Sequence, residues 1–299
     1  MTDPLDLPIC TACGVQHSAP SPSSCKICDD PRQYIPPTGQ SWTTLRKLQS
    51  SGAYHNEFTP MGSHPDHLIT IRTVPRLAIG QRAFLCRTPY GNVLWDCLTY
   101  LDDETIAQIN KLGGIAAIVI SHPHYYATNL HWADTFNCPV YLSAEDAEWV
   151  MRKGPRQDFW EGSELRLPLG PGDDAGDVVA VKTGGHFPGS SVLWWKSLRT
   201  LLIADTIFVV PSGVYHVGRL PGTTSFSFMW SYPNMIPLPP DEVHKIWKAI
   251  AHTEFDDTYG AFEGGETFGN SKRRVLDSAK IIVKAMGYLD HAIHQERCL

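Results

Sequence analysis

The sequence predicts an α/β or α+β sandwich, in which helices lie outside two β-sheets, preceded by a small module held together by a metal ion. Strand patterns occur in both halves of the chain, with helical patterns between and after them. Four cysteines occur within the first tenth of the chain, and its 299 residues are enough for one large domain with a small appendage. We therefore expect a zinc-ribbon-like module and linker over residues 1–40, and a sandwich domain over residues 41–299.

Two CxxC knuckles supply those four cysteines, Cys10 with Cys13 and Cys25 with Cys28, and eleven residues separate them. Each knuckle turns tightly enough to bring two thiolates onto one ion, and the pair completes a tetrahedral site. We expect a structural Zn²⁺ there, with rubredoxin-like iron, two disulfides or a redox CxxC as alternatives. A closed site of four thiolates leaves no open position for catalysis. Few basic residues accompany the cysteines, which favours a structural or protein-contact role.

Strand and helix patterns follow one another from about residue 66 onward. Apolar and β-branched runs bounded by turn residues predict strands at 68–74, 83–87, 92–96, 114–120, 139–142, 178–183, 191–195 and 200–203. Helical patterns span 102–112, 144–152, 240–252 and 272–294. The helix over 102–112 is typical of the pattern, because acids fill its first turn and Gly113-Gly114 stops it.

Two histidines end the strand predicted over 114–120, in the run Ser121-His122-Pro-His124. In an extended backbone, residues i and i+2 point to the same face, so both imidazoles can point at one metal ion. His186 follows another strand in a glycine-rich loop, and Asp205 closes an apolar strand, where an unpaired carboxylate is costly to bury. Loop, capping or turn roles are the alternatives for each residue alone. The four together predict one shared metal ion.

These motifs resemble those of the metallo-β-lactamase superfamily over roughly residues 66–265. The matching features are an apolar strand that ends at Asp96, the HxH strand end, a Gly-His-x-Pro-Gly-Ser loop over 185–190, and an Ala-Asp strand end. The resemblance implies an α+β fold, an αβ/βα four-layer sandwich with the metal site between the sheet edges. It also implies that the first metal is held by His122, His124 and His186, with Asp205 bridging or lying close.

The chain departs from the family pattern at the ligands of a second metal. The family motif is HxHxDH, and here Tyr126 replaces its aspartate and Ala127 replaces its second histidine. The stretch 258–264 lacks the final histidine of the family. The resemblance therefore implies a single active-site ion, Zn²⁺ or another divalent transition metal. Glu263 and Glu266 are nearby carboxylates that can substitute for the missing ligands.

Such a site predicts a metal-dependent hydrolase. The ion lowers the pKa of a bound water to about 7 and polarises the carbonyl of a small ester, thioester, lactone or lactam. Asp205 and Tyr126 are the candidate catalytic side chains, because the usual water-orienting aspartate is missing and a tyrosine can donate to a leaving group or oxyanion. A packing aromatic is the alternative for Tyr126. The alternative function is a catalytically silent member that binds a metabolite or a protein.

The composition of the chain limits which classes of partner are expected. A formal net charge of −6 and the lack of a basic stripe argue against a nuclease and against nucleic acid as a partner. No apolar run approaches the roughly 18 residues of a membrane span, and the N-terminus lacks the basic and apolar regions of a signal peptide. We expect a cytoplasmic protein with a small-molecule substrate and no membrane partner; a homo-oligomer is compatible with the sequence. The aromatic segment 225–235 can line an apolar substrate pocket or pack in the core.

Overall fold

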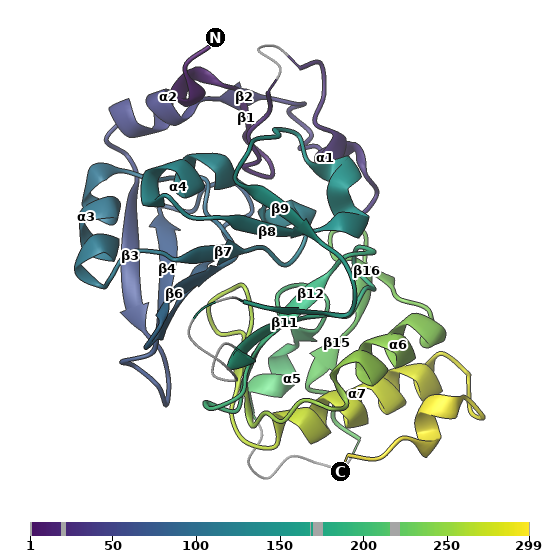
Figure 1. Ribbon diagram of the computed structural model, residues 1–299. Coiled ribbons are helices and arrows are strands. Elements are labelled where there is room, and N and C mark those ends of the chain that lie inside the picture. The colour runs from purple at the N-terminus through teal and green to yellow at the C-terminus, as the bar shows by residue number, and fades with distance from the viewer. Residues whose placement is uncertain (1, 19–21, 168, 170–175, 216–221, 299) are drawn as a thin grey trace. The chain divides into compact units, whose positions relative to one another are not determined.

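The computed structural model describes residues 2–18, 22–167, 169, 176–215 and 222–298. The chain forms two compact units, Met1–Trp160 with Leu169–Gly172, and Glu161–Pro168 with Asp173–Leu299. Each unit contains one large β-sheet (Figure 1). Among the described helices, none is long and apolar enough to cross a membrane.

The sheet of the first unit has seven strands in the order β3-β4-β5-β6-β7-β8-β9. Strands β3 to β6 are antiparallel, whereas β6 to β9 run parallel. The parallel strand β7 is buried along its whole length, as expected when both faces of a sheet are covered. The strands are β3 (His55–Pro60), β4 (Leu68–Val74), β5 (Ala83–Thr88), β6 (Gly91–Trp95), β7 (Ala117–Val119), β8 (Val140–Ser143) and β9 (Gln157–Trp160).

Helices connect the parallel strands of this sheet. Helix α3 (Asp103–Lys111) links β6 to β7, and its N-cap Asp102 accepts a 2.9 Å hydrogen bond from the backbone N–H of Thr105. Helix α4 (Asn129–Phe136) links β7 to β8, and the 3₁₀-helix η3 (Ala144–Trp149) follows β8. The ligand-bearing histidines therefore lie on the connection between β7 and α4.

The cysteine-bearing segment belongs to the same compact unit. Its strands β1 (Ile9–Cys10) and β2 (Trp42–Thr43) form an antiparallel pair. A small core of Ile9, Leu45, Leu48 and Tyr100 attaches it to the rest of the unit. Its helical elements are η1 (Pro4–Asp6), α1 (Lys26–Asp29) and α2 (Leu45–Ser50).

The second unit contains a sheet of six strands in the order β10-β11-β12-β13-β18-β19, of which only the β13·β18 pair is parallel. The strands are β10 (Glu164–Arg166), β11 (Val178–Lys182), β12 (Ser191–Trp195), β13 (Thr200–Leu202), β18 (Asp257–Tyr259) and β19 (Glu266–Thr267). Two short pairs accompany this sheet: β14 (Phe208–Val209) with β15 (Phe226–Ser227), and β16 (Met229–Ser231) with β17 (Ile236–Pro237).

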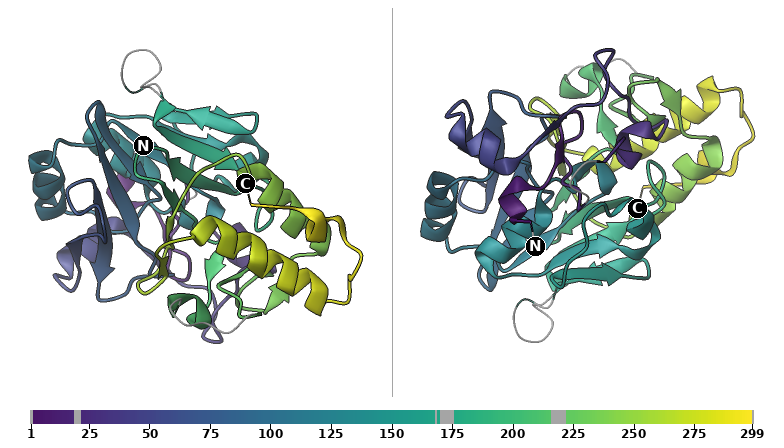
Figure 2. Two further views of the ribbon diagram at one scale, coloured as in Figure 1. Left: turned by 90° about the horizontal axis from the view of Figure 1, so that it is seen from below. Right: turned by 90° about the horizontal axis from the view of Figure 1, so that it is seen from above.

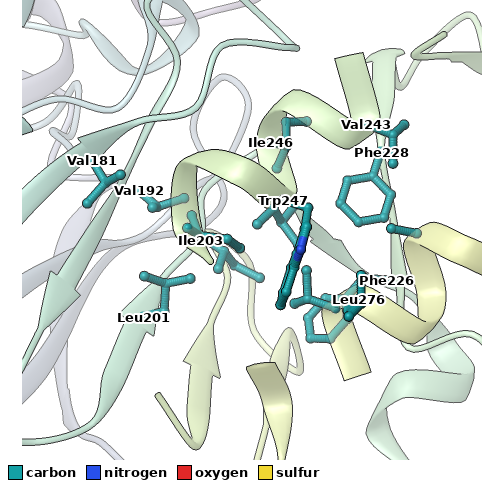
Figure 3. Close-up of a cluster of buried hydrophobic side chains, with 14 of the residues drawn as sticks. Val181, Val192, Leu201, Ile203, Phe226, Phe228, Val243, Ile246, Trp247 and Leu276 are labelled. Atoms are coloured by element: carbon teal, nitrogen blue, oxygen red, sulfur yellow. The ribbon is translucent and has the colours of Figure 1, made fainter. Parts of the chain in front are cut away.

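Helices α6 (Pro240–Ile250) and α7 (Ser271–Ala285) run side by side in the second unit (Figure 2). Between them and the sheet lies the main core of this unit, in which Trp247 is the largest side chain (Figure 3). Burying one Val, Leu, Ile or Phe side chain contributes about 1.5–3 kcal/mol, so this cluster is a principal source of stability for the unit. The remaining helical elements are α5 (Pro211–Val214) and η5 (Ala292–Gln295).

The α+β prediction is confirmed, and two of the helix predictions are wrong in extent. The last helix was expected over 272–294 but ends at Ala285, because Gly287 adopts a left-handed conformation with φ of 94°. A separate 3₁₀ turn, η5, follows. The helix expected over 144–152 is the shorter 3₁₀-helix η3. Helix α4 and strand β3 were not predicted.

Candidate metal centres

The two histidines of the HxH motif lie together at the end of β7. His122 is extended, with φ of −168° and ψ of 169°, and serves as N-cap to the 3₁₀-helix η2 (Pro123–Tyr125), which contains His124. Their ring centroids are 5.2 Å apart and both side chains are buried. The structure brings the two rings together through a tight turn and not through an extended strand, since the strand already ends at Val119.

Hydrogen bonds fix the orientation of His122. Asp96 follows β6, and its Oδ1 accepts a 2.8 Å hydrogen bond from the backbone N–H of Ser121. The Ser121 hydroxyl lies 2.9 Å from His122 Nδ1. With Nδ1 engaged in this way, Nε2 is the ring nitrogen that remains for a metal ion.

The glycine-rich loop between β11 and β12 positions His186. Gly185 has φ of 89°, and a Cβ atom at this position would lie 2.9 Å from Ile246 Cδ1, so the approach of the loop to α6 requires a glycine. His186 Nδ1 lies 3.3 Å from the carbonyl oxygen of Met229. A carbonyl only accepts, so Nδ1 carries the proton, and in this tautomer Nε2 is the nitrogen with the lone pair that can bind a metal ion.

Asp205 follows β13 and is 7% exposed. The Tyr232 hydroxyl donates a 2.7 Å hydrogen bond to its backbone oxygen, and the Tyr232 ring lies 5.8 Å from the His186 ring. Burial, together with the charge of Asp205, raises the pKa of Tyr232 well above its ordinary value, so this phenol stays neutral. Tyr232 was not predicted as a site residue, although it lies within the aromatic segment 225–235 that was expected to line a pocket.

Two sets of buried side chains among the described residues can each hold a metal ion. One set offers three imidazoles and one carboxylate, a donor combination that suits Zn²⁺ and other divalent transition metals. Glu263 and Glu266 are in neither set. The first set is His122, His124, His186 and Asp205, and the second is Cys10, Cys13, Cys25 and Cys28.

The cysteine set has the geometry of a closed centre. One sulfur from each residue lies within 4.8 Å of the other three, and all four cysteines are free thiols, so the disulfide alternative does not describe this structure. A hydrogen bond from Cys13 is the main cause that lowers the pKa of Cys10 to about 6. Hydrogen bonds from the other three cysteines, and a smaller one from His17, lower the pKa of Cys25. Burial raises the pKa of Cys13, and the hydrogen bond with Cys10 raises that of Cys28, so a bound ion would have to draw the protons off these two thiols. Four thiolates bind zinc or iron, and the ion would supply much of the folding energy of so small a segment.

Tyr126 and Ala127 occupy the positions that the family pattern gives to ligands of a second metal. Tyr126 is buried and lines a small pocket together with Val15, Gln16 and Met151, among others. Burial raises the pKa of its phenol well above the ordinary value, and the charge of Asp146 adds to the effect. These surroundings favour packing over proton transfer for Tyr126.

Comparison with known proteins identifies the class. The family model of the metallo-β-lactamase superfamily matches residues 80–243, a range that includes all three histidines and the aspartate of the first set. The chain therefore belongs to the metallo-β-lactamase superfamily, whose members are mostly metal-dependent hydrolases. Both the resemblance seen in the sequence motifs and the fold class that it implied are confirmed.

A similar curated protein is the uncharacterized protein YmaE of Bacillus subtilis (strain 168). It is 43% identical over 284 residues, which cover 93% of this chain and 96% of YmaE.

Three solved structures share the fold. VMB-1 has a TM-score of 0.52 at 10% identity, and the match covers 78% of this chain and 98% of the VMB-1 chain. The metallo-β-lactamase DIM-1 has a TM-score of 0.51 at 10% identity, and the match covers 77% of this chain and 98% of the DIM-1 chain. FIM-1 from Pseudomonas aeruginosa, in its mono-zinc form, has a TM-score of 0.50 at 13% identity, with 77% and 96% covered. At these identities the likeness concerns the fold alone.

Proposed function

We propose that the chain is a metal-dependent hydrolase with one active-site ion, which His122, His124 and His186 hold and beside which Asp205 lies. The observation that carries the proposal is the donor set: three buried imidazoles and one buried carboxylate. Three histidine ligands are typical of catalytic zinc, in which one coordination position stays open. The contacts at Nδ1 of His122 and His186 support it, because a histidine whose Nδ1 bonds to a second group presents Nε2 as its metal-binding nitrogen.

The residues at the second-metal positions support a single ion. The methyl group of Ala127 offers no donor atom, and Tyr126 is buried as a neutral phenol, which is a poor ligand. FIM-1, a protein with the same fold, is described in a mono-zinc form. One ion is therefore compatible with this architecture.

When bound, a zinc-type ion polarises a carbonyl oxygen and lowers the pKa of water to about 7. The remaining chemistry belongs to the side chains. Asp205 supplies the carboxylate of the set, and this carboxylate can accept the proton that the attacking water loses. Ser121 and Met229 hold the rings of His122 and His186 in one orientation. The substrates that fit this chemistry are small esters, thioesters, lactones and lactams.

Metal content per chain tests the assignment. We expect two ions in the wild-type protein, one fewer when Cys13 and Cys28 are both changed to Ser, and one fewer in His124→Ala. The exposed histidine His55, 57% of whose side chain is accessible, provides the control His55→Ala, which should lose no metal. An unchanged metal content in His124→Ala would contradict the site. A screen of esters, thioesters, lactones and lactams then tests the activity, which should disappear in His122→Ala.

A second candidate function is a silent member that binds a metabolite or a protein. The replacement of two ligand positions by Tyr126 and Ala127 motivates it. Retention of the ion in the histidine set, with no turnover across the whole screen, would favour this function over hydrolysis. Turnover that His122→Ala abolishes would exclude it.

A further inference from the structure

The turn that follows Cys13 is hydrogen-bonded to the segment that follows His124. The backbone N–H of Gln16 donates a 3.0 Å hydrogen bond to the carbonyl oxygen of Ala127. The Thr99 hydroxyl donates a 3.1 Å hydrogen bond to the carbonyl oxygen of Gly14. The cysteine-bearing turn is therefore tied both to the metal-ligand loop and to the segment around Thr99.

Thr128, at the end of the ligand loop, forms a third contact with the segment around Thr99. The Thr128 hydroxyl lies 3.2 Å from the carbonyl oxygen of Leu98 and 3.1 Å from that of Thr99, and donates to both. Thr99 thus joins the cysteine-bearing turn on one side and the end of the ligand loop on the other. Both threonines are buried, so these hydrogen bonds do not compete with water.

The approach of the turn to Thr99 depends on a glycine. Gly14 has φ of 82°, and a Cβ atom at this position would lie 2.1 Å from Thr99 Oγ1. Any larger residue would push the turn away from Thr99. The neighbouring Gln16 side chain is also buried, and it bonds to the carbonyl oxygen of Pro4 at 2.8 Å and to Arg152 Nη1 at 2.5 Å. The contact between this turn and its neighbours therefore combines close packing with hydrogen bonds.

The second knuckle contacts the element that follows β8. Lys26 lies beside Cys25, and its Nζ bonds both to the carbonyl oxygen of Glu148 at 2.9 Å and to its carboxylate at 2.8 Å. The Trp149 ring lies 5.7 Å from Lys26 Nζ and 5.3 Å from the guanidinium carbon of Arg32. Both knuckles therefore rest on connections at the same end of the parallel strands β7 and β8.

We propose that the four-cysteine centre is a positioning device for the loop that bears His122 and His124. Between β7 and α4 this loop contains only the three-residue turn η2 as regular structure, so contacts from outside it must hold it in place. The ion in the cysteine centre holds the turn at Gly14 to Gln16, and that turn holds Ala127. Emptying the cysteine centre therefore loosens the ligand loop. The expected effect of emptying the cysteine centre on metal binding rests on the proposed function of the histidines. The expected effect on the loop does not.

Hydrogen exchange on the full-length protein tests the loop directly. In Cys28→Ser, we expect amides over 122–128 to exchange at least tenfold faster, while a peptide over α7 (Ser271–Ala285) in the second unit, which contains no metal ligand, keeps its wild-type rate. Metal analysis must show that the cysteine-bound ion is lost. Unchanged exchange over 122–128, with that ion absent, would overturn the proposal.

Variants that keep all four cysteines separate docking from folding. Thr99→Val removes the hydroxyl, and Gly14→Ala introduces the Cβ clash, so both should speed exchange over 122–128 while the cysteine-bound ion stays. Thr99→Ser retains the hydroxyl and should restore the wild-type rate. Gly39→Ala is the matched control, because Gly39 has φ of 88° and a Cβ there would meet nothing within 4 Å, so only its own turn is strained. Equal exchange in Thr99→Val and Thr99→Ser would contradict the role of the hydroxyl.

Co²⁺ binding distinguishes failure of this proposal from failure of the proposed function. In a chelator competition, Thr99→Val should bind Co²⁺ at the histidine set about tenfold more weakly than wild type. If wild type binds no Co²⁺ at the histidines, the proposed function fails and hydrogen exchange alone decides the positioning role. If exchange accelerates but the affinity is unchanged, the centre holds the loop without affecting its metal ligands, so the expected effect on metal binding is wrong while the proposed function stands.

Discussion

Replacing Ser121 by alanine should weaken metal binding at the histidine set. An ion on His122 Nε2 requires the proton on Nδ1, and the Ser121 hydroxyl, 2.9 Å away, is positioned to accept it. Ser121→Ala removes that acceptor in a buried setting. The ring then either leaves a buried N–H without this acceptor or changes tautomer and loses its ligand nitrogen.

The size of the effect follows from that hydrogen bond. Leaving a buried polar group unsatisfied costs about 1–3 kcal/mol, and part of this cost is also present in the metal-free protein. A net loss of about 1–2 kcal/mol corresponds to roughly 5- to 30-fold in affinity, since about 1.4 kcal/mol is a factor of ten. This range overlaps the roughly 10- to 100-fold that is typical when the partner of a ligating histidine is removed.

Competition with a chromophoric chelator measures this affinity, with Zn²⁺ titrated into metal-free protein whose cysteine centre has been refilled first. Ser271→Ala is the matched control, because Ser271 is also fully buried and its hydroxyl bonds to Thr267 Oγ1 at 2.7 Å, at the start of α7. It should reduce stability without changing the affinity. An affinity for Ser121→Ala within twofold of wild type would refute the assignment of Nδ1 and with it the assignment of Nε2 as the ligand.

Three further predictions follow from single contacts. Tyr126→Phe should lower kcat less than about threefold, because the surroundings of Tyr126 favour packing. A loss of about 10²-fold or more in the same assay would show that Tyr126 donates a proton. Tyr232→Phe removes the hydrogen bond to the Asp205 backbone and should lower metal affinity about tenfold; unchanged affinity and kcat would show that this support is dispensable. A hydrogen bond with His244 holds the pKa of Glu296 below its ordinary 4.5, so the stabilisation is complete above that value and is lost as pH falls below it. The urea midpoint should therefore fall less between pH 6 and pH 3.5 in Glu296→Gln than in wild type, and an equal fall would contradict the linkage.

The ligand-bearing strand ends were predictable because their signals are local. A β-branched run that stops at Ser121-His122 and an apolar strand that stops at Asp205 each carry strand and ligand within ten residues. The cysteine centre was predictable for the same reason, since each knuckle brings two ligands together without help from the rest of the chain. The end of α7 had a local signal as well: Gly287, at φ of 94°, ends the helix well before the predicted end.

The contacts between distant segments were not predictable from patterns. Nothing in the spacing of Gly14 or Gln16 indicates that this turn contacts Thr99 and Ala127, because those partners lie far along the chain. Tyr232 was missed for a similar reason, since an aromatic residue near the site resembles any other packing aromatic until its hydroxyl is seen at Asp205. Helix α4 did leave a usable signal, the left-handed Asn137 at its C-cap.

The docking of the cysteine segment has a consequence for the newly made chain. The Ser18 hydroxyl bonds to the carbonyl oxygen of Met151, which lies 133 residues later. At about 5–20 residues per second, the ribosome adds Met151 on the order of ten seconds after Ser18. The cysteines can therefore capture their ion before the strands that receive them have been synthesised. Metal that is present during translation can then bind the N-terminal segment before the segment docks.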